Sequence, residues 1–141
     1  MKRIFGLALL LTGALVLSAG ISVAGASTKF SSTGQITGSN LVLDFEEGSL
    51  KLFASVDYQL DATGLQRWGD CAGQAVLIYD ASGTVTLTPD DKGRVTGTLI
   101  LVSPPSGFLC APQHVEYTNM TLTNVTTGHV YRLDSISRDY P

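Results

Sequence analysis

After its first 26 residues the chain follows a strand-like pattern, in which apolar residues recur at every second position. Leu41, Leu43 and Phe45 occupy alternate positions, and the segment 50–60 repeats this spacing with Leu50, Leu52, Ala54, Val56, Tyr58 and Leu60. Successive side chains of a strand point to opposite faces, so one such set faces the interior. Thr, Val, Ser and Gly are frequent, and no stretch sustains a helical period. The chain is therefore predicted to be all-β.

Turn-forming residues recur at roughly ten-residue spacing, which is typical of small antiparallel folds. Asp80-Ala-Ser-Gly83 and Pro89-Asp-Asp-Lys-Gly93 are both predicted to be hairpin turns. The segment 75–79 is apolar at both parities, which favours a central strand covered on both faces. We predict a small antiparallel β-sandwich of about eight strands, with a small β-barrel as the alternative. The expected strands are 28–36, 41–46, 50–60, 75–79, 84–88, 95–102, 115–125 and 130–136.

One expected strand changes its parity in the middle. Val115 and Tyr117 set one alternation, whereas Met120 and Leu122 fall on the other. One additional residue in a strand allows the apolar side chains of both halves to face the same side of the sheet, and it locally disrupts the pairing. The sequence therefore predicts a β-bulge near Asn119.

Cys71 and Cys110 are the two cysteines of the chain, and each lies in an expected long loop, 61–73 or 103–112. If the chain is exported, its two cysteines most economically form one disulfide. Closing a loop of about 40 residues stabilises the fold by about 4 kcal/mol in the chain-entropy model. The bond would join the two loops at one end of the sandwich, close to Trp68 and Phe108.

The N-terminal segment has the composition of a secretory signal peptide. Lys2 and Arg3 precede an apolar run over residues 4–23, and Ala24-Gly25-Ala26 has the small-residue form of a cleavage site. An uncleaved membrane anchor is the alternative, since about 20 apolar residues can span a bilayer. We predict a signal peptide over residues 1–26 and a single domain over 27–141. The mature protein is then secreted to the extracellular space or, alternatively, the periplasm.

The charge balance restricts the class of partner. The sequence has nine Lys and Arg against twelve Asp and Glu, and two of the basic residues belong to the signal segment. Nucleic acids and anionic membranes are bound through clustered Lys and Arg. We expect no nucleic acid and, after cleavage, no membrane as partner. The expected partner is therefore a protein or a carbohydrate ligand.

The candidate catalytic residues do not form a known arrangement in the sequence. His114 could serve as a base for Ser106 or for Cys110, because nucleophilic catalysis needs a hydroxyl or thiol beside a base. No Gly-x-Ser-x-Gly motif surrounds the serine, and a disulfide would consume the thiol. We therefore predict no enzyme activity, with a small secreted hydrolase as the second alternative function.

Metal ligands and glycosylation sequons are sparse. His114 and His129 lack the clustering of a zinc site. The acidic pairs 46–47 and 90–91 lie in expected turns, without the alternating spacing of a calcium loop. We predict solvated turns and no metal or other cofactor. Two acceptor sequons for N-glycosylation begin at Asn119 and Asn124.

Three loop residues are the candidate binding residues: Trp68, Phe108 and Leu109. An exposed tryptophan could stack on a sugar or anchor a protein partner, whereas a buried one would cap the core beside the disulfide. We predict a secreted, non-catalytic binding or structural domain. The alternative is a proteinaceous protease inhibitor that uses the loop 103–112, because its three prolines and Cys110 would hold Phe108 and Leu109 rigid.

Overall fold

The computed structural model describes residues 16–17, 19–20 and 29–141. The predicted signal peptide lies outside the described residues, apart from two short strands. These are β1 (Val16–Leu17) and β2 (Ala19–Gly20), which pair antiparallel. The prediction of a signal peptide therefore remains a prediction.

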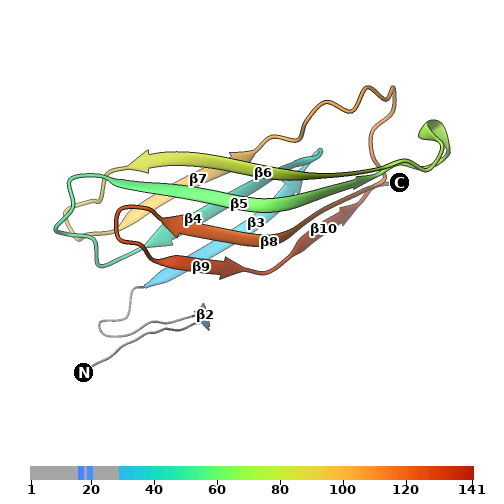
Figure 1. Ribbon diagram of the computed structural model, residues 1–141. Helices are drawn as coiled ribbons and strands as arrows, with labels where there is room; N and C mark the ends of the chain where they lie inside the picture. The colour runs from blue at the N-terminus through green and yellow to red at the C-terminus, as the bar shows by residue number, and fades with distance from the viewer. Residues whose placement is uncertain (1–15, 18, 21–28) are drawn as a thin grey trace.

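The other eight strands form two antiparallel sheets that face each other (Figure 1). The larger sheet has the order β10-β8-β5-β6. Both β9 and β10 pair with the same edge of β8: β10 with residues 114–117 and β9 with residues 120–123. The smaller sheet has the order β3-β4-β7. The larger sheet contains β5 (Val56–Arg67), β6 (Val76–Leu87), β8 (His114–Asn124), β9 (Val130–Leu133) and β10 (Ile136–Asp139). The smaller contains β3 (Phe30–Thr37), β4 (Asn40–Glu47) and β7 (Val95–Leu101).

The hydrophobic core lies between the two sheets and uses alternate residues of each strand. Leu41, Leu43 and Phe45 are buried on β4, as their spacing predicts. Across from them β5 contributes Val56, Tyr58 and Leu60, and β8 contributes Val115, Tyr117, Met120 and Leu122. The prediction of an all-β sandwich with about eight strands is confirmed. The sheets remain separate, so the alternative of a closed barrel is wrong for the described residues.

The strands β5 and β6 are longer than the sequence predicts. Each has twelve residues, and they pair without interruption from Val56 opposite Leu87 to Arg67 opposite Val76. The predicted hairpin turn at 80–83 is therefore wrong, and so is the loop prediction for residues 61–67. Turn preference is local, whereas β5 is paired on both sides, by β6 and by β8. The nonlocal ladder determines the conformation here.

Two further expectations about strands are wrong. The segment 50–55 is a loop instead of the first half of a strand, and Leu52 is fully exposed. This loop is fixed against the β6–β7 turn, because the Leu50 N–H donates to the Gly93 carbonyl over 2.9 Å. The segment 75–79 belongs to an edge strand, with Val76 and Ile78 exposed on its outer face. Its apolar residues at both parities do not indicate a central position.

The predicted bulge near Asn119 is confirmed. Asp61 of β5 lies opposite Thr121, and Thr63 lies opposite Thr118, so one residue of β5 faces two residues of β8. Asn119 has a φ of 52° and is exposed. An Asn tolerates this left-handed conformation better than most residues. The additional residue keeps the apolar side chains on both halves of β8 directed at the core.

Gly64 provides a test of the long β5–β6 ladder. Tyr79 lies opposite Gly64 and packs over it, so that a Cβ at Gly64 would lie 2.4 Å from the Tyr79 Cζ. Gly64→Ala is expected to displace the ring and destabilise the fold by about 1–3 kcal/mol, measured by urea denaturation. Gly34 on β3 is the control, because a Cβ there meets ordinary contacts of 3.8 Å or more. Gly34→Ala should change stability by less than about 0.5 kcal/mol. Equal effects would contradict the close packing.

Candidate functional site

The two cysteines join the ends of the sheets as predicted. Cys71 lies in a short 3-10 helix, η1 (Asp70–Ala72), which follows β5 after Trp68 and Gly69. Cys110 lies in the loop 102–113 between β7 and β8, and the two residues form a disulfide with a Cα–Cα distance of 6.4 Å. The bond therefore connects the β5–β6 connection to a loop that comes from the other sheet. A disulfide is compatible with an oxidising compartment.

Trp68 is buried beside this disulfide and is 1% exposed. Its Nε1–H donates to the Cys110 carbonyl over 3.1 Å, and its ring meets the Phe108 ring edge-on, with centroids 4.8 Å apart. It lies outside the main core cluster between the sheets. Of the two roles considered for Trp68, this placement agrees with a core cap. A ligand has no access to the indole ring here.

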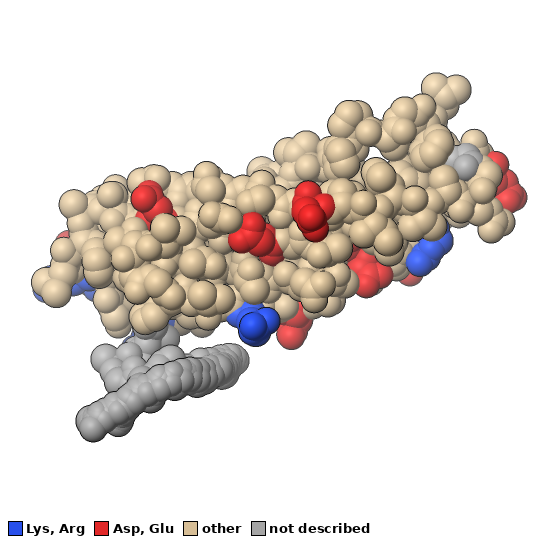
Figure 2. Space-filling model, in the orientation of Figure 1, with Lys and Arg blue, Asp and Glu red and all other residues tan. Residues whose placement is uncertain are grey.

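Phe108 and Leu109 lie on the outside of the same cluster. Phe108 is 42% exposed although one side of its ring contacts Trp68, and Leu109 is fully exposed. The loop 102–113 has no charged residue. Figure 2 shows neither blue nor red surface on the segment that rises at the upper right, where Figure 1 places this loop. The structure thus brings the three predicted site residues together, with Trp68 inside and the other two outside.

Further apolar side chains are exposed near this loop. Val102 is the first residue of the loop. Val76 and Ile78 lie at the start of β6, directly after the segment that holds Cys71. The N–H of Trp68 donates to the Ala75 carbonyl over 2.8 Å. The backbone of Val76, the next residue, therefore lies close to the backbone of Trp68. Val76 and Ile78 are not among the predicted binding residues, because the apolar pattern of 75–79 predicted a covered central strand.

His114 lies at the start of β8, between two carboxylates. Its Nδ1 lies 2.5 Å from Asp139 Oδ1 on β10, and its Nε2 lies 3.1 Å from Glu116 Oε1. The hydrogen bond with Asp139, followed by that with Glu116, raises the pKa of the His114 imidazole above its usual value of 6.5. His114 therefore ties the C-terminal strand to β8 most strongly when the imidazole is protonated.

The His114 contacts predict a pH dependence. Because the folded-state pKa is raised, the stabilisation is fully present below about pH 6.5 and is lost as the pH rises through the folded-state pKa. Unfolding free energies from urea denaturation at a series of pH values should show this loss in the wild type. His114→Gln should remove that part of the pH dependence. An unchanged slope in the variant would show that these contacts are not linked to stability.

The structure also places the other candidate catalytic residues. The Cys110 thiol is consumed in the disulfide, so it is not available as a nucleophile for His114. Ser106 Oγ accepts a hydrogen bond from the Phe108 N–H over 3.2 Å. The hydrogen bonds of His114 go to Asp139 and Glu116, so no bond between His114 and Ser106 forms among the described residues.

The predicted acidic turns differ from each other. Asp90 Oδ1 accepts hydrogen bonds from the N–H groups of Lys92 and Arg94, both over 2.9 Å, in an exposed turn. Glu46 and Glu47 both lie on β4, so the prediction of a turn at this pair is wrong. Glu46 is half-exposed, whereas Glu47 is 0% exposed and therefore not solvated. Within residues 29–141 no group of three metal-ligating side chains is close enough to hold a metal ion. No helix of the described part of the chain is long and apolar enough to span a membrane.

Glu47 is the acceptor in a buried polar cluster at the end opposite the disulfide. Its Oε1 accepts from Tyr58 Oη over 2.6 Å and from Asn124 Nδ2 over 2.8 Å, and its Oε2 accepts from Tyr131 Oη. His129 Nδ1 lies 3.8 Å from Oε2. Burial raises the pKa of the Glu47 carboxyl, but the hydrogen bonds from His129, Tyr131, Tyr58 and Asn124 outweigh it and lower the pKa overall. The carboxylate is therefore held charged inside the fold.

Comparison of the chain with protein-family models, with curated proteins and with solved structures finds no match.

Proposed function

We propose that the protein is an exported, non-catalytic binding module, and that it contacts its partner through the loop 102–113. The observation that carries the proposal is the placement of Leu109, which is fully exposed one residue before the disulfide. A fully exposed leucine loses contact with water when a partner covers it, which favours binding. The disulfide and the hydrogen bond from Trp68 to the Cys110 carbonyl both fix Cys110, the residue next to Leu109.

The surroundings of Leu109 support an apolar contact surface. Phe108 is partly exposed beside it, Val102 is exposed at the start of the loop, and no charge interrupts the loop. Apolar and aromatic side chains at the centre of an interface supply most of its binding free energy. A loop that is already ordered loses little entropy on binding. These features favour a protein partner with a complementary apolar surface.

Site-specific crosslinking tests this proposal. A photo-crosslinking amino acid is placed at Leu109 in one variant and at Leu52 in another. Both leucines are fully exposed, and their loops, 102–113 and 48–55, lie at opposite ends of the sandwich in Figure 1. The variants are expressed with their signal segment in the native host. We expect a discrete adduct from position 109. Excess wild-type protein should compete this adduct away, whereas excess Phe108→Ala/Leu109→Ala protein should not. Identical products from both positions would contradict the proposal.

A protease inhibitor is the second candidate function. The exposed Phe108-Leu109 pair directly precedes Cys110, which the disulfide fixes, and a loop held rigid loses less entropy when it enters a protease active site. A panel of serine and cysteine proteases tests it. Inhibition with an intact loop, lost in Leu109→Asp, would favour this function. Absence of inhibition at micromolar concentration would leave the binding module as the proposal.

A further inference from the structure

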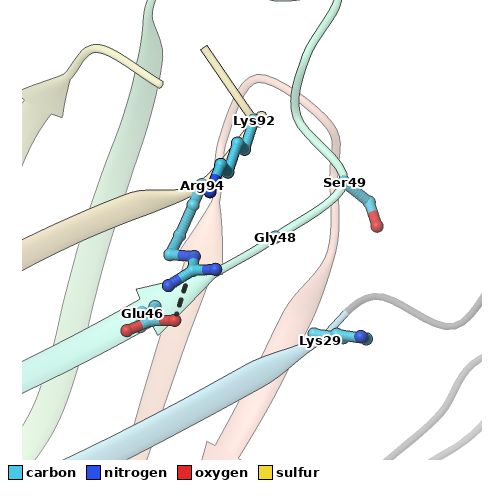
Figure 3. A pocket seen from close by; sticks show the side chains of 6 residues that line it. All are labelled: Lys29, Glu46, Gly48, Ser49, Lys92 and Arg94. Atoms are coloured by element: carbon cyan, nitrogen blue, oxygen red, sulfur yellow. Dashed lines mark ion pairs between the residues drawn. The ribbon is translucent and has the colours of Figure 1, made fainter. Parts of the chain in front are cut away.

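A pocket lies at the end of the sandwich opposite the disulfide (Figure 3). It is lined by Lys29, Glu46, Gly48, Ser49, Lys92 and Arg94. These residues come from three separate segments: the start of β3, the end of β4 with the following loop, and the β6–β7 turn. The pocket has a volume of about 280 Å³, whereas one water molecule needs about 10–15 Å³ of such space. It can therefore admit a polyatomic ligand.

The lining is basic, although the chain as a whole is acidic. Lys29 and Lys92 have no carboxylate within ion-pair distance among residues 29–141. Arg94 Nε lies 3.4 Å from Glu46 Oε2, in a pair whose side chains are both about half-exposed. A guanidinium carries five N–H donors, so this contact leaves others for a ligand. In Figure 3, Lys92 and Arg94 lie on one side of the Gly48 backbone and Lys29 lies on the other.

The backbone beside these cations adds a donor. Ser49 has a φ of 67°, an uncommon conformation for a residue with a side chain. The N–H groups of its neighbours are used, since Gly48 donates to the Lys29 carbonyl over 2.7 Å and Leu50 donates to Gly93. Within the described part of the chain, the Ser49 N–H has no acceptor. Strained backbone of this kind often lies at ligand sites.

At this end of the sandwich, the carboxylates of Asp90, Asp91 and Glu47 do not neutralise the cations of the pocket. Asp90 turns its Oδ1 to the backbone N–H groups of Lys92 and Arg94, within its own turn. Asp90 and Asp91 do not line the pocket, and Glu47 is buried in its own cluster. Among the described residues of the lining, Glu46 is the one carboxylate, against three cations. The pocket therefore favours an anion.

We propose that this pocket binds a tetrahedral oxyanion, a phosphate or sulfate group, through Lys29, Lys92 and Arg94. Phosphate and sulfate oxygens accept charge-assisted hydrogen bonds from Lys and Arg and hydrogen bonds from backbone N–H groups. The Ser49 N–H and hydroxyl supply the uncharged donors. This site is independent of the proposed function, because it lies at the other end of the strands from the loop 102–113.

The probes are inorganic phosphate and inorganic sulfate, added at constant ionic strength balanced with sodium chloride. Amide chemical shifts of the whole mature protein report the binding. We expect saturable shifts at Gly48 and Ser49, and at least about tenfold weaker binding in Lys92→Gln or Lys29→Gln. Lys51→Gln is the matched control, because it removes the same charge from the same end without lining the pocket. It should change the affinity by less than about twofold.

Two results would overturn the proposal. One is equal weakening by Lys51→Gln and Lys92→Gln, which would indicate diffuse electrostatic attraction. The other is a titration without shifts at residues 48 and 49. Circular dichroism and urea denaturation show whether each variant is folded, so loss of binding is distinguished from loss of structure.

Vesicles distinguish a free oxyanion from a lipid headgroup. Phosphatidylcholine vesicles with and without phosphatidic acid are sedimented with the protein. If the headgroup is the source, the acidic vesicles bind, inorganic phosphate competes, and Lys92→Gln weakens binding. If free phosphate is the source, phosphate binds in the pocket and the vesicles do not. Vesicle binding that Lys92→Gln leaves unchanged, without any phosphate response, contradicts the pocket.

Discussion

Glu47→Ala is expected to destabilise the protein by about 3–5 kcal/mol, because it removes the acceptor of a buried cluster. Tyr58 Oη and Asn124 Nδ2 both donate to Oε1, and they would remain in the core without that partner. Urea denaturation of the two proteins measures the loss. Glu46→Ala is the control, since Glu46 is half-exposed and its ion pair among residues 29–141 is with Arg94. Its effect should stay below about 1 kcal/mol. Similar losses in both variants would contradict the role of the cluster.

The same carboxylate sets a second pH dependence. Its folded-state pKa is lowered from 4.5, so its stabilisation is present above about pH 4.5 and is lost as the pH falls through the folded-state value. This window lies below the one expected for His114, so the two effects can be separated. Glu47→Gln should remove the acid-side loss and leave the His114 effect unchanged.

Replacing both cysteines, as Cys71→Ala/Cys110→Ala, is expected to lower the unfolding free energy by about 4 kcal/mol. The bond closes a sequence separation of 39 residues, and its loss frees the unfolded chain. Urea denaturation measures the change, and both residues are replaced so that no free thiol remains.

Reduction of the wild-type protein is the control for this variant. The reduced wild type and the double variant should lose similar stability, since both lack the constraint. A loss below about 1 kcal/mol would show that the hydrogen bond and ring contact of Trp68 hold the loop without the disulfide.

The features that follow local rules were predictable from the sequence. The alternation of Leu41, Leu43 and Phe45 identifies a half-buried strand, and the parity change before Met120 identifies the bulge. The disulfide follows from the cysteine count. The turn predicted at 80–83 was wrong because Asp, Ser and Gly favour turns locally, whereas pairing with β5 across twelve residues determines the structure.

The arrangement of the candidate site residues was predictable in part. Two cysteines in separate loops placed Trp68 near Phe108, which the ring contact confirms. The burial of Glu47 was not predictable, because Tyr58, Asn124 and Tyr131 reach it from three other strands. The basic pocket was missed for the same reason. Its lining residues are distant in sequence, and a net charge does not show where charges gather.

The length of β5 and β6 has a consequence for the two ends of the molecule. Twelve residues at about 3.3 Å each separate the ends of these strands by about 40 Å. Electrostatic screening at physiological salt acts over about 8 Å. The charges around Lys92 therefore exert no field at Leu109, and the two ends can change independently. A substitution that recharges one end leaves the chemistry of the other intact.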